Sequence, residues 1–136
     1  MMAKPVPFPT TDTAAFWQGC NRDELLYQRC GACGRVQFYP RPFCAACQSN
    51  DLTWLRSERH GTVHSFTVLR QPANRAFHAD VPLVIALIDL DEGFRMMMNV
   101  AGDDRLSVAI GCRVRVCFEQ RGADQKLPQA MLEGAP

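Results

Sequence analysis

The sequence predicts a mostly β protein with one short helix near its start, a four-cysteine metal-binding segment, and a barrel of about five strands. Two C-x-x-C pairs, "CGAC" and "CAAC", stand ten residues apart. Apolar and polar residues alternate in stretches such as "CRVRVCFEQ", which is the period of a strand with one buried face. Hydrophobic residues make up 47% of the 136 residues, as in ordinary globular domains.

Residues 1–24 are expected to form an extended arm followed by a short helix. Three prolines precede "TTDTAAFWQGC", in which a Thr-Asp pair can cap a helix over about 12–19 that Gly19 ends. Phe16 and Trp17 are adjacent, so their rings cannot both face the same way. We expect one ring to pack on the domain and the other to remain available to a partner protein, which makes both candidate docking residues.

Residues 25–53 are predicted to form a zinc ribbon around the two cysteine pairs. The spacing lets both sulfurs of a pair reach one ion from a single tight turn, and four thiolates suit tetrahedral Zn²⁺ at about 2.3 Å. Because four sulfurs leave no open coordination position, the ion would be structural rather than catalytic. Iron, held as in rubredoxin, has the same ligands and is the less favoured occupant. The predicted ligands are Cys30, Cys33, Cys44 and Cys47.

The turns after the two pairs differ in sequence. Gly34 follows the first pair and permits the positive φ that such a turn needs. Gln48 stands at the matching place after the second pair, so this turn is less standard, although Asn50 nearby can take a left-handed conformation.

Residues 54–122 are predicted to form an OB-type Greek-key barrel. "DLTWLRSERHGTVHSFTVLR" is β-rich, with Gly61 as a bulge or sharp bend. "LVIALIDL" is apolar on both faces, and "DEG" turns the chain into "FRMMMNV". Residues 123–136 are expected to be a tail with one possible short strand at "LPQAML". The candidate core positions near the first barrel strands are Leu52, Trp54, Val63, Phe66 and Val68.

Charge and composition narrow the functional class. The net charge is +1, and residues 54–136 carry ten basic and ten acidic side chains, whereas a nucleic-acid-binding domain concentrates positive charge. No apolar run approaches the roughly 18–20 residues of a membrane span, and no signal peptide is apparent. Seven cysteines are an odd number, which fits a reducing compartment, so a cytoplasmic protein is expected.

No catalytic residues are predicted in this chain, because no nucleophile, base and orienting group can be identified together. The histidines lie at a bend, on a strand and in a loop: His60, His64 and His78. The cysteines outside the two pairs lie among apolar neighbours and are expected to be small buried hydrophobic residues: Cys20, Cys112 and Cys117.

The order of these segments resembles a known family. "ELLYQRCGACGRVQFYPRPFCAAC", "GTVHSFTV" and "DLDEG", within about residues 14–120, are similar to proteins that join a rubredoxin-like zinc ribbon to an OB-fold domain, long catalogued as a domain of unknown function. The resemblance implies a non-catalytic subunit of a thiolase-like or aldolase-like complex in lipid metabolism. The ribbon and helix would dock the partner, and the barrel would help bind or channel acyl-CoA. Gln48 and the residues past 122 depart from the family pattern.

If the chain handles acyl-CoA, the phosphates need cations and the pantetheine arm needs an apolar groove. The loop at 71–82 and the residue before it supply the candidate acyl-CoA contacts Arg70, Arg75, Phe77 and His78. The alternative interpretation is a solvated surface loop. Residues 96–98 are three methionines on one strand, so at least one points outward, toward a groove or a subunit contact.

Two other functions stay open at this point. A single-stranded nucleic-acid-binding module would use the same two folds, but it would need a basic groove with stacking aromatic residues. A self-assembling scaffold that needs no thiolase-like partner is also compatible with the sequence.

Overall fold

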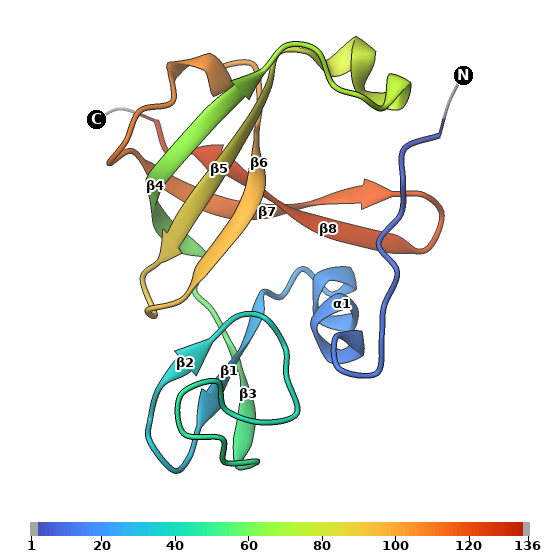
Figure 1. Ribbon diagram of the computed structural model, residues 1–136. Coiled ribbons are helices and arrows are strands. Elements are labelled where there is room, and N and C mark those ends of the chain that lie inside the picture. The colour runs from blue at the N-terminus through green and yellow to red at the C-terminus, as the bar shows by residue number, and fades with distance from the viewer. Residues whose placement is uncertain (1–2, 135–136) are drawn as a thin grey trace.

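The computed structural model describes residues 3–134, in which one helix and two sheets are arranged around a continuous core (Figure 1). A three-stranded antiparallel sheet has the order β2-β1-β3, and a closed barrel has the order β4-β5-β6-β8-β7. The predicted mostly β fold is therefore confirmed. The elements are α1 (Ala14–Asn21), β1 (Leu26–Cys30), β2 (Val36–Gln37), β3 (Leu52–Arg56), β4 (His60–Leu69), η1 (Arg75–Asp80), β5 (Leu83–Leu90), β6 (Arg95–Ala101), η2 (Arg105–Ser107), β7 (Arg113–Arg121) and β8 (Gln125–Leu132).

Helix α1 begins and ends two residues later than predicted. It ends later because Gly19 packs inside the helix rather than stopping it. A Cβ atom at Gly19 would lie 2.8 Å from the Leu26 side chain, so the glycine permits a close approach of α1 to β1. The tip of the β7–β8 hairpin is held against the same helix. Asn21 accepts a hydrogen bond from the Lys126 backbone N–H at 2.8 Å, and the Gln125 side chain donates to the Trp17 carbonyl at 3.1 Å.

Two strand assignments differ from the sequence prediction. Strand β3 pairs with β1 in the ribbon sheet, and the short strand expected at "LPQAML" is part of the longer β8, which closes the barrel. A proline within a barrel strand is unusual, since proline has no N–H for a ladder. Strand β8 pairs with β7 along its whole length, but it pairs with β6 only at Val100↔Ala130 and Ala101↔Met131. Pro128 therefore lies where β8 has a partner strand on one side only, which is where proline is tolerated.

The bulge expected at Gly61 lies elsewhere in β4. The pairing of β4 with β5 shifts register between Val63 and Ser65, whereas Gly61 stays in register opposite Leu90. Gly61 instead allows two strands to approach closely, because a Cβ there would lie 2.7 Å from the Asp89 carbonyl oxygen. Of the candidate core residues near these strands, Val63 is buried, and the partly buried ones are Leu52, Trp54, Phe66 and Val68.

The β5–β6 hairpin joins the barrel to the ribbon. Phe94, just after the turn, stacks on Tyr27 of β1 with ring centroids 4.7 Å apart. The Glu92 carboxylate accepts hydrogen bonds from the Ser57 hydroxyl at 2.8 Å and from the Glu58 N–H at 2.7 Å. One apolar core therefore runs from the ribbon into the barrel. Within residues 3–134, no helix has the length and apolar character needed to cross a membrane.

Candidate functional site

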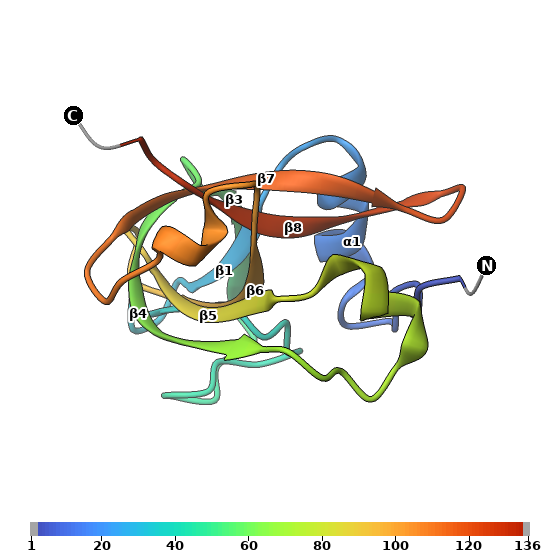
Figure 2. The same cartoon turned by 90° about the horizontal axis from the view of Figure 1, so that it is seen from above.

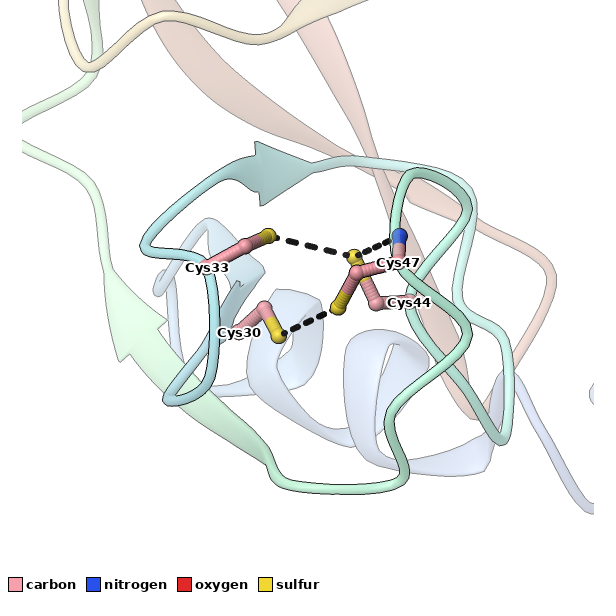
Figure 3. A group of neighbouring side chains, drawn as sticks. All are labelled: Cys30, Cys33, Cys44 and Cys47. Atoms are coloured by element: carbon pink, nitrogen blue, oxygen red, sulfur yellow. Dashed lines mark hydrogen bonds between the residues drawn. The ribbon is translucent and has the colours of Figure 1, made fainter.

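The four predicted ligand sulfurs converge at the tip of the ribbon (Figure 3). They all lie within 4.8 Å of one another, and the Cys30–Cys47 and Cys33–Cys44 sulfur pairs are 3.5 and 3.7 Å apart. A tetrahedron with Zn–S bonds of about 2.3 Å has edges of about 3.8 Å. The donor set and its spacing therefore fit a single tetrahedral metal ion.

The two cysteine turns have the same backbone geometry. In each, the N–H of the residue after the second cysteine donates to the carbonyl of the first at 2.9 Å: Gly34 to Cys30, and Gln48 to Cys44. Both donors have positive φ, 79° for Gly34 and 65° for Gln48. Asn50, which could have taken the left-handed conformation, does not, because the repeated hydrogen bond fixes Gln48 as the position that must adopt it.

The local electrostatics favour a bound cation. The N–H groups of Cys47 and Ala46 point at the Cys44 sulfur and lower the pKa of Cys44 to about 6. The N–H of Ser49 lowers the pKa of Cys47, but the sulfur of Cys30, then burial and the two other sulfurs, raise it to about 12. Four thiolates so close together cannot all carry charge unless a cation compensates them. A divalent ion supplies that compensation.

The cysteines outside the cluster were expected to be buried, and they differ in how far they are. Cys20 is fully buried, and burial raises its pKa to about 12. Cys117 is half-buried, and the same desolvation raises its pKa, while Cys112 is also only half-buried.

An apolar groove of about 500 Å³ opens on the outer face of the barrel, where the arm, α1, the ribbon and the barrel meet. Its floor includes side chains from three strands: Leu83, Ile85, Met97 and Leu127. Its walls include Pro7, Phe16, Trp17 and Phe38. Met97 is the outward-facing residue of the three methionines, 63% exposed, whereas Met96 and Met98 are buried. Segments far apart in the sequence thus build one apolar site.

A second cavity of about 270 Å³ adjoins the groove and has a polar lining. The N-terminal arm closes this end, where η1 and the β7–β8 hairpin also lie (Figure 2). Lys4 pairs with Asp80 at 2.6 Å, and Arg121 donates to the Pro5 carbonyl at 3.0 Å. The Phe77 ring lies near both cations, with Lys4 at 5.7 Å and Arg121 at 5.6 Å from its centroid.

The structure separates the four candidate acyl-CoA contacts. Phe77 lines both the groove and the polar cavity. Arg70 and His78 line a different hollow with Pro72, whose carbonyl lies 3.0 Å from a His78 ring nitrogen. Arg75 is exposed and lines neither the groove nor the polar cavity. Acyl-CoA contact by these residues remains a prediction, and only Phe77 is placed at the groove.

The two candidate docking aromatics differ in exposure. Phe16 is 3% exposed and packs edge-on against Trp17 and Phe38, with ring centroids 4.9 and 5.0 Å away. Its ring therefore offers no surface to a partner in this conformation. Trp17 is half-buried and lines the groove.

The three histidines lie apart from one another and outside the groove's lining. His60 Nδ1 lies 2.6 Å from the Glu133 carboxylate, and His64 Nδ1 lies 3.5 Å from Asp89. His78 lies in η1.

Sequence reasoning offered a short strand at "LPQAML" but did not assign it to the barrel or to the groove. Leu127, Pro128 and Gln129 line the groove, but all belong to the segment expected to be a tail. Within Leu127–Met131 only Gln129 is polar, so no apolar–polar alternation marked this segment as a barrel strand.

Comparison with known proteins agrees with this architecture. The family profiles "ChsH2, rubredoxin-like zinc ribbon domain" and "ChsH2, C-terminal OB-fold domain" match residues 17–53 and 54–119. The chain is 38% identical over 112 residues, 82% of its length, to the "3-oxo-4,17-pregnadiene-20-carboxyl-CoA hydratase alpha subunit" of Mycobacterium tuberculosis. It spans only 35–39% of the length of the hydratase subunits that it matches.

Two further similarities extend over most of both proteins. A "DUF35 domain-containing scaffold protein" of Methanothermobacter thermautotrophicus is 30% identical over 112 residues, which is 81% of this chain and 84% of the relative. A solved chain described as "Ltp2-ChsH2(DUF35) aldolase" superposes with a TM-score of 0.83 at 29% identity, covering 93% of this chain and 98% of that one.

Proposed function

Since this chain belongs to the DUF35 family, in which a rubredoxin-like zinc ribbon precedes an OB-fold domain, we propose that it is a non-catalytic accessory subunit of an enzyme complex acting on acyl-CoA thioesters. The names of its relatives support this role, because they include a CoA-ester hydratase subunit, a scaffold protein and an aldolase. The enzyme partner is proposed to be thiolase-like or aldolase-like, in a hetero-oligomer.

The apolar groove is the observation that carries the proposal. Its volume of about 500 Å³ lies within the roughly 300–1,000 Å³ typical of small-molecule sites. The arm, the ribbon and three barrel strands each contribute part of it. A narrow, largely apolar thioester arm suits such a site. We therefore place the acyl or pantetheine portion of acyl-CoA in this groove.

The proposed metal is one structural Zn²⁺ held by Cys30, Cys33, Cys44 and Cys47, with iron as the less favoured occupant. When bound, the ion would fix the two cysteine turns relative to each other. The chain between these turns carries Phe38, which packs against Phe16 of α1 and Phe94 of the barrel. The metal site would thereby hold one wall of the groove in place without taking part in chemistry.

The proposed docking surface is the ribbon together with α1. Tyr39 and Phe43, in the loop that links the two cysteine turns, are 63% and 45% exposed. Large apolar side chains are enriched in the centres of protein interfaces. Trp17 lies at the groove nearby and would contact either the partner or the ligand.

Co-purification with thiolase-like and aldolase-like proteins of the same host tests the proposal. We expect the wild-type chain to retain such an enzyme, and the Tyr39→Ser/Phe43→Ser variant to lose about tenfold or more in affinity, as for buried aromatic anchors. The matched control is Leu106→Ser/Ile110→Ser, two apolar residues that are 52% and 72% exposed and lie in and just after η2. The η2 segment lies at the end of the barrel away from the ribbon (Figure 1). A chain that associates with none of these enzymes would contradict the proposed role.

The nucleic-acid alternative gains no support from the barrel surface. Strand binding needs exposed aromatic side chains for base stacking. Phe94 is buried, and Phe66 and Phe118 are half-buried and pack against the core. Phe77 lies at the groove beside Lys4 and Arg121, but it is a single half-buried ring rather than a row of stacking aromatic residues.

A further inference from the structure

The apolar groove and the polar cavity meet at a common wall. The residues that line both are Phe77, Leu83, Asn99, Arg121 and Gln129. Phe77 and Leu83 contribute apolar surface, while Asn99 and Gln129 contribute carboxamides. An elongated ligand lying in the groove would therefore pass polar groups of the protein before it reached the second cavity.

Gln129 carries an unsatisfied acceptor in this wall. Its side chain is 5% exposed, and its Nε2 donates to the Glu119 carboxylate at 3.2 Å. A carboxylate only accepts hydrogen bonds, so Glu119 fixes which end of the amide faces it. The opposite end, Oε1, is buried and has no hydrogen-bond partner within residues 3–134. Leaving a buried carbonyl oxygen without a hydrogen bond costs free energy, which an N–H or O–H donor from a ligand would recover.

Asn99 stands beside Gln129 on the same face of the sheet. The parallel pairing of β6 and β8 joins Val100 to Ala130, and both of these side chains point into the core. Asn99 and Gln129 each precede a member of that pair by one residue, so both point outward, toward the groove. The Asn99 carboxamide offers two donors and one acceptor. Two carboxamides thus stand next to each other where the apolar groove becomes polar.

We propose that this wall recognises a secondary amide on a narrow apolar chain. The amide N–H of the ligand donates to Gln129 Oε1, and its carbonyl accepts a hydrogen bond from the Asn99 side chain. The apolar part of the chain lies on Leu83 and Leu127 in the groove. An ester or a fully substituted amide lacks the donor and leaves the Gln129 oxygen unsatisfied. Under the proposed function, on which this identification of the source rests, the amide belongs to the pantetheine arm.

The test is a titration of the full-length, zinc-loaded chain with N-hexylacetamide and N-hexyl-N-methylacetamide. The indole N–H signal of Trp17, which lines the groove, is followed by NMR. We expect the wild-type chain to bind the N–H amide about 3- to 10-fold more tightly, the value of one hydrogen bond to a buried acceptor. Equal binding of the two amides by the wild-type chain would overturn the inference without any variant.

Gln129→Leu removes the acceptor and keeps a side chain of similar bulk. This variant should bind both amides alike, whereas Gln18→Leu, an exposed glutamine outside both cavities, should keep the wild-type preference. A preference that persists in Gln129→Leu would assign the selectivity to another group and refute the role of Gln129.

Pantetheine and the co-purification experiment separate this inference from the proposed function. Saturable binding of pantetheine to the wild-type chain, weakened 3- to 10-fold by Gln129→Leu, supports pantetheine as the source. If the chain prefers the N–H amide but binds neither pantetheine nor an enzyme partner, amide recognition at this wall is supported and pantetheine is rejected as the ligand. If the chain binds an enzyme partner but shows no preference between the two amides, the proposed function is supported and amide recognition by Gln129 and Asn99 is rejected.

Discussion

Gln48 occupies a backbone conformation that usually selects glycine. Its φ of 65° is matched by the φ of 79° at Gly34, and both N–H groups make the same 2.9 Å hydrogen bond back to the first cysteine of their pair. A residue with a Cβ in this region is disfavoured by roughly 1–2 kcal/mol. The second cysteine turn is therefore more strained than the first.

Replacing Gln48 by glycine should relieve this strain. We expect Gln48→Gly to raise the free energy of unfolding by about 0.5–1 kcal/mol, the strain relief being partly offset by the greater entropy of glycine in the unfolded chain. Urea denaturation of the zinc-loaded protein measures the change. Gly34→Ala is the reciprocal variant and should lower stability by about 1 kcal/mol through the same φ. A destabilised Gln48→Gly would show that the glutamine side chain has a role that the turn does not reveal.

At the scale of single elements, the turn of the β5–β6 hairpin connects the two sheets. Gly93 has a φ of 109°, and the turn carries Glu92 toward the segment that links β3 to β4. There the carboxylate satisfies the Ser57 hydroxyl, whose residue is 4% exposed, and the Glu58 N–H. One side chain in a hairpin turn thus fixes the direction in which the chain leaves the ribbon.

Glu92→Ala should destabilise the protein by about 1–3 kcal/mol, because two donors, one of them on a buried residue, lose a charged acceptor. The neighbouring Glu58 is exposed, and Glu58→Ala should change stability by less than about 0.5 kcal/mol. Chemical denaturation followed by circular dichroism compares the two variants. Equal effects of both would show that general surface charge, rather than this contact, sets the stability of the junction.

The elements also show where sequence patterns sufficed and where they failed. The cysteine spacing, the alternation around Val114 and Val116, and the "DEG" turn predicted the ribbon and most of the barrel, because each pattern reflects local geometry. Gly19 and Gly61 have uses set by contacts between elements: Gly19 packs against Leu26 of β1, and Gly61 packs against Asp89 of the neighbouring strand β5. The groove was not predictable, since it forms only where four separated segments meet.

At the scale of the whole molecule, the ribbon and the barrel share one apolar core. Phe38 contacts both Phe16 and Phe94, so the chain between the cysteine turns reaches α1 and the barrel together. The two sheets are thus expected to depend on each other for stability, although their assignment to residues 25–53 and 54–122 as separate domains stays a prediction.

Removing the metal should therefore affect the whole chain. We expect Cys44→Ser to lose bound zinc and more than about 4 kcal/mol of stability, with the ribbon unfolding and the Trp17 environment changing with it. Metal analysis and thermal denaturation measure both effects. Cys112→Ser, a half-buried thiol outside the cluster, should retain its zinc. A Cys44→Ser protein that is metal-free but as stable as wild type would contradict a structural role for the ion.

The join between β6 and β8 has a mechanical consequence for the barrel. The other neighbouring strands share ladders of three to eight residue pairs, whereas this join has two and is parallel. The shortest strand ladder of the closed barrel therefore lies beside the groove. Separating the strands there disrupts fewer residue pairs than at any other join of the barrel. We therefore expect β8 to move away from β6 when a bulkier ligand binds, while the other strands keep their pairing.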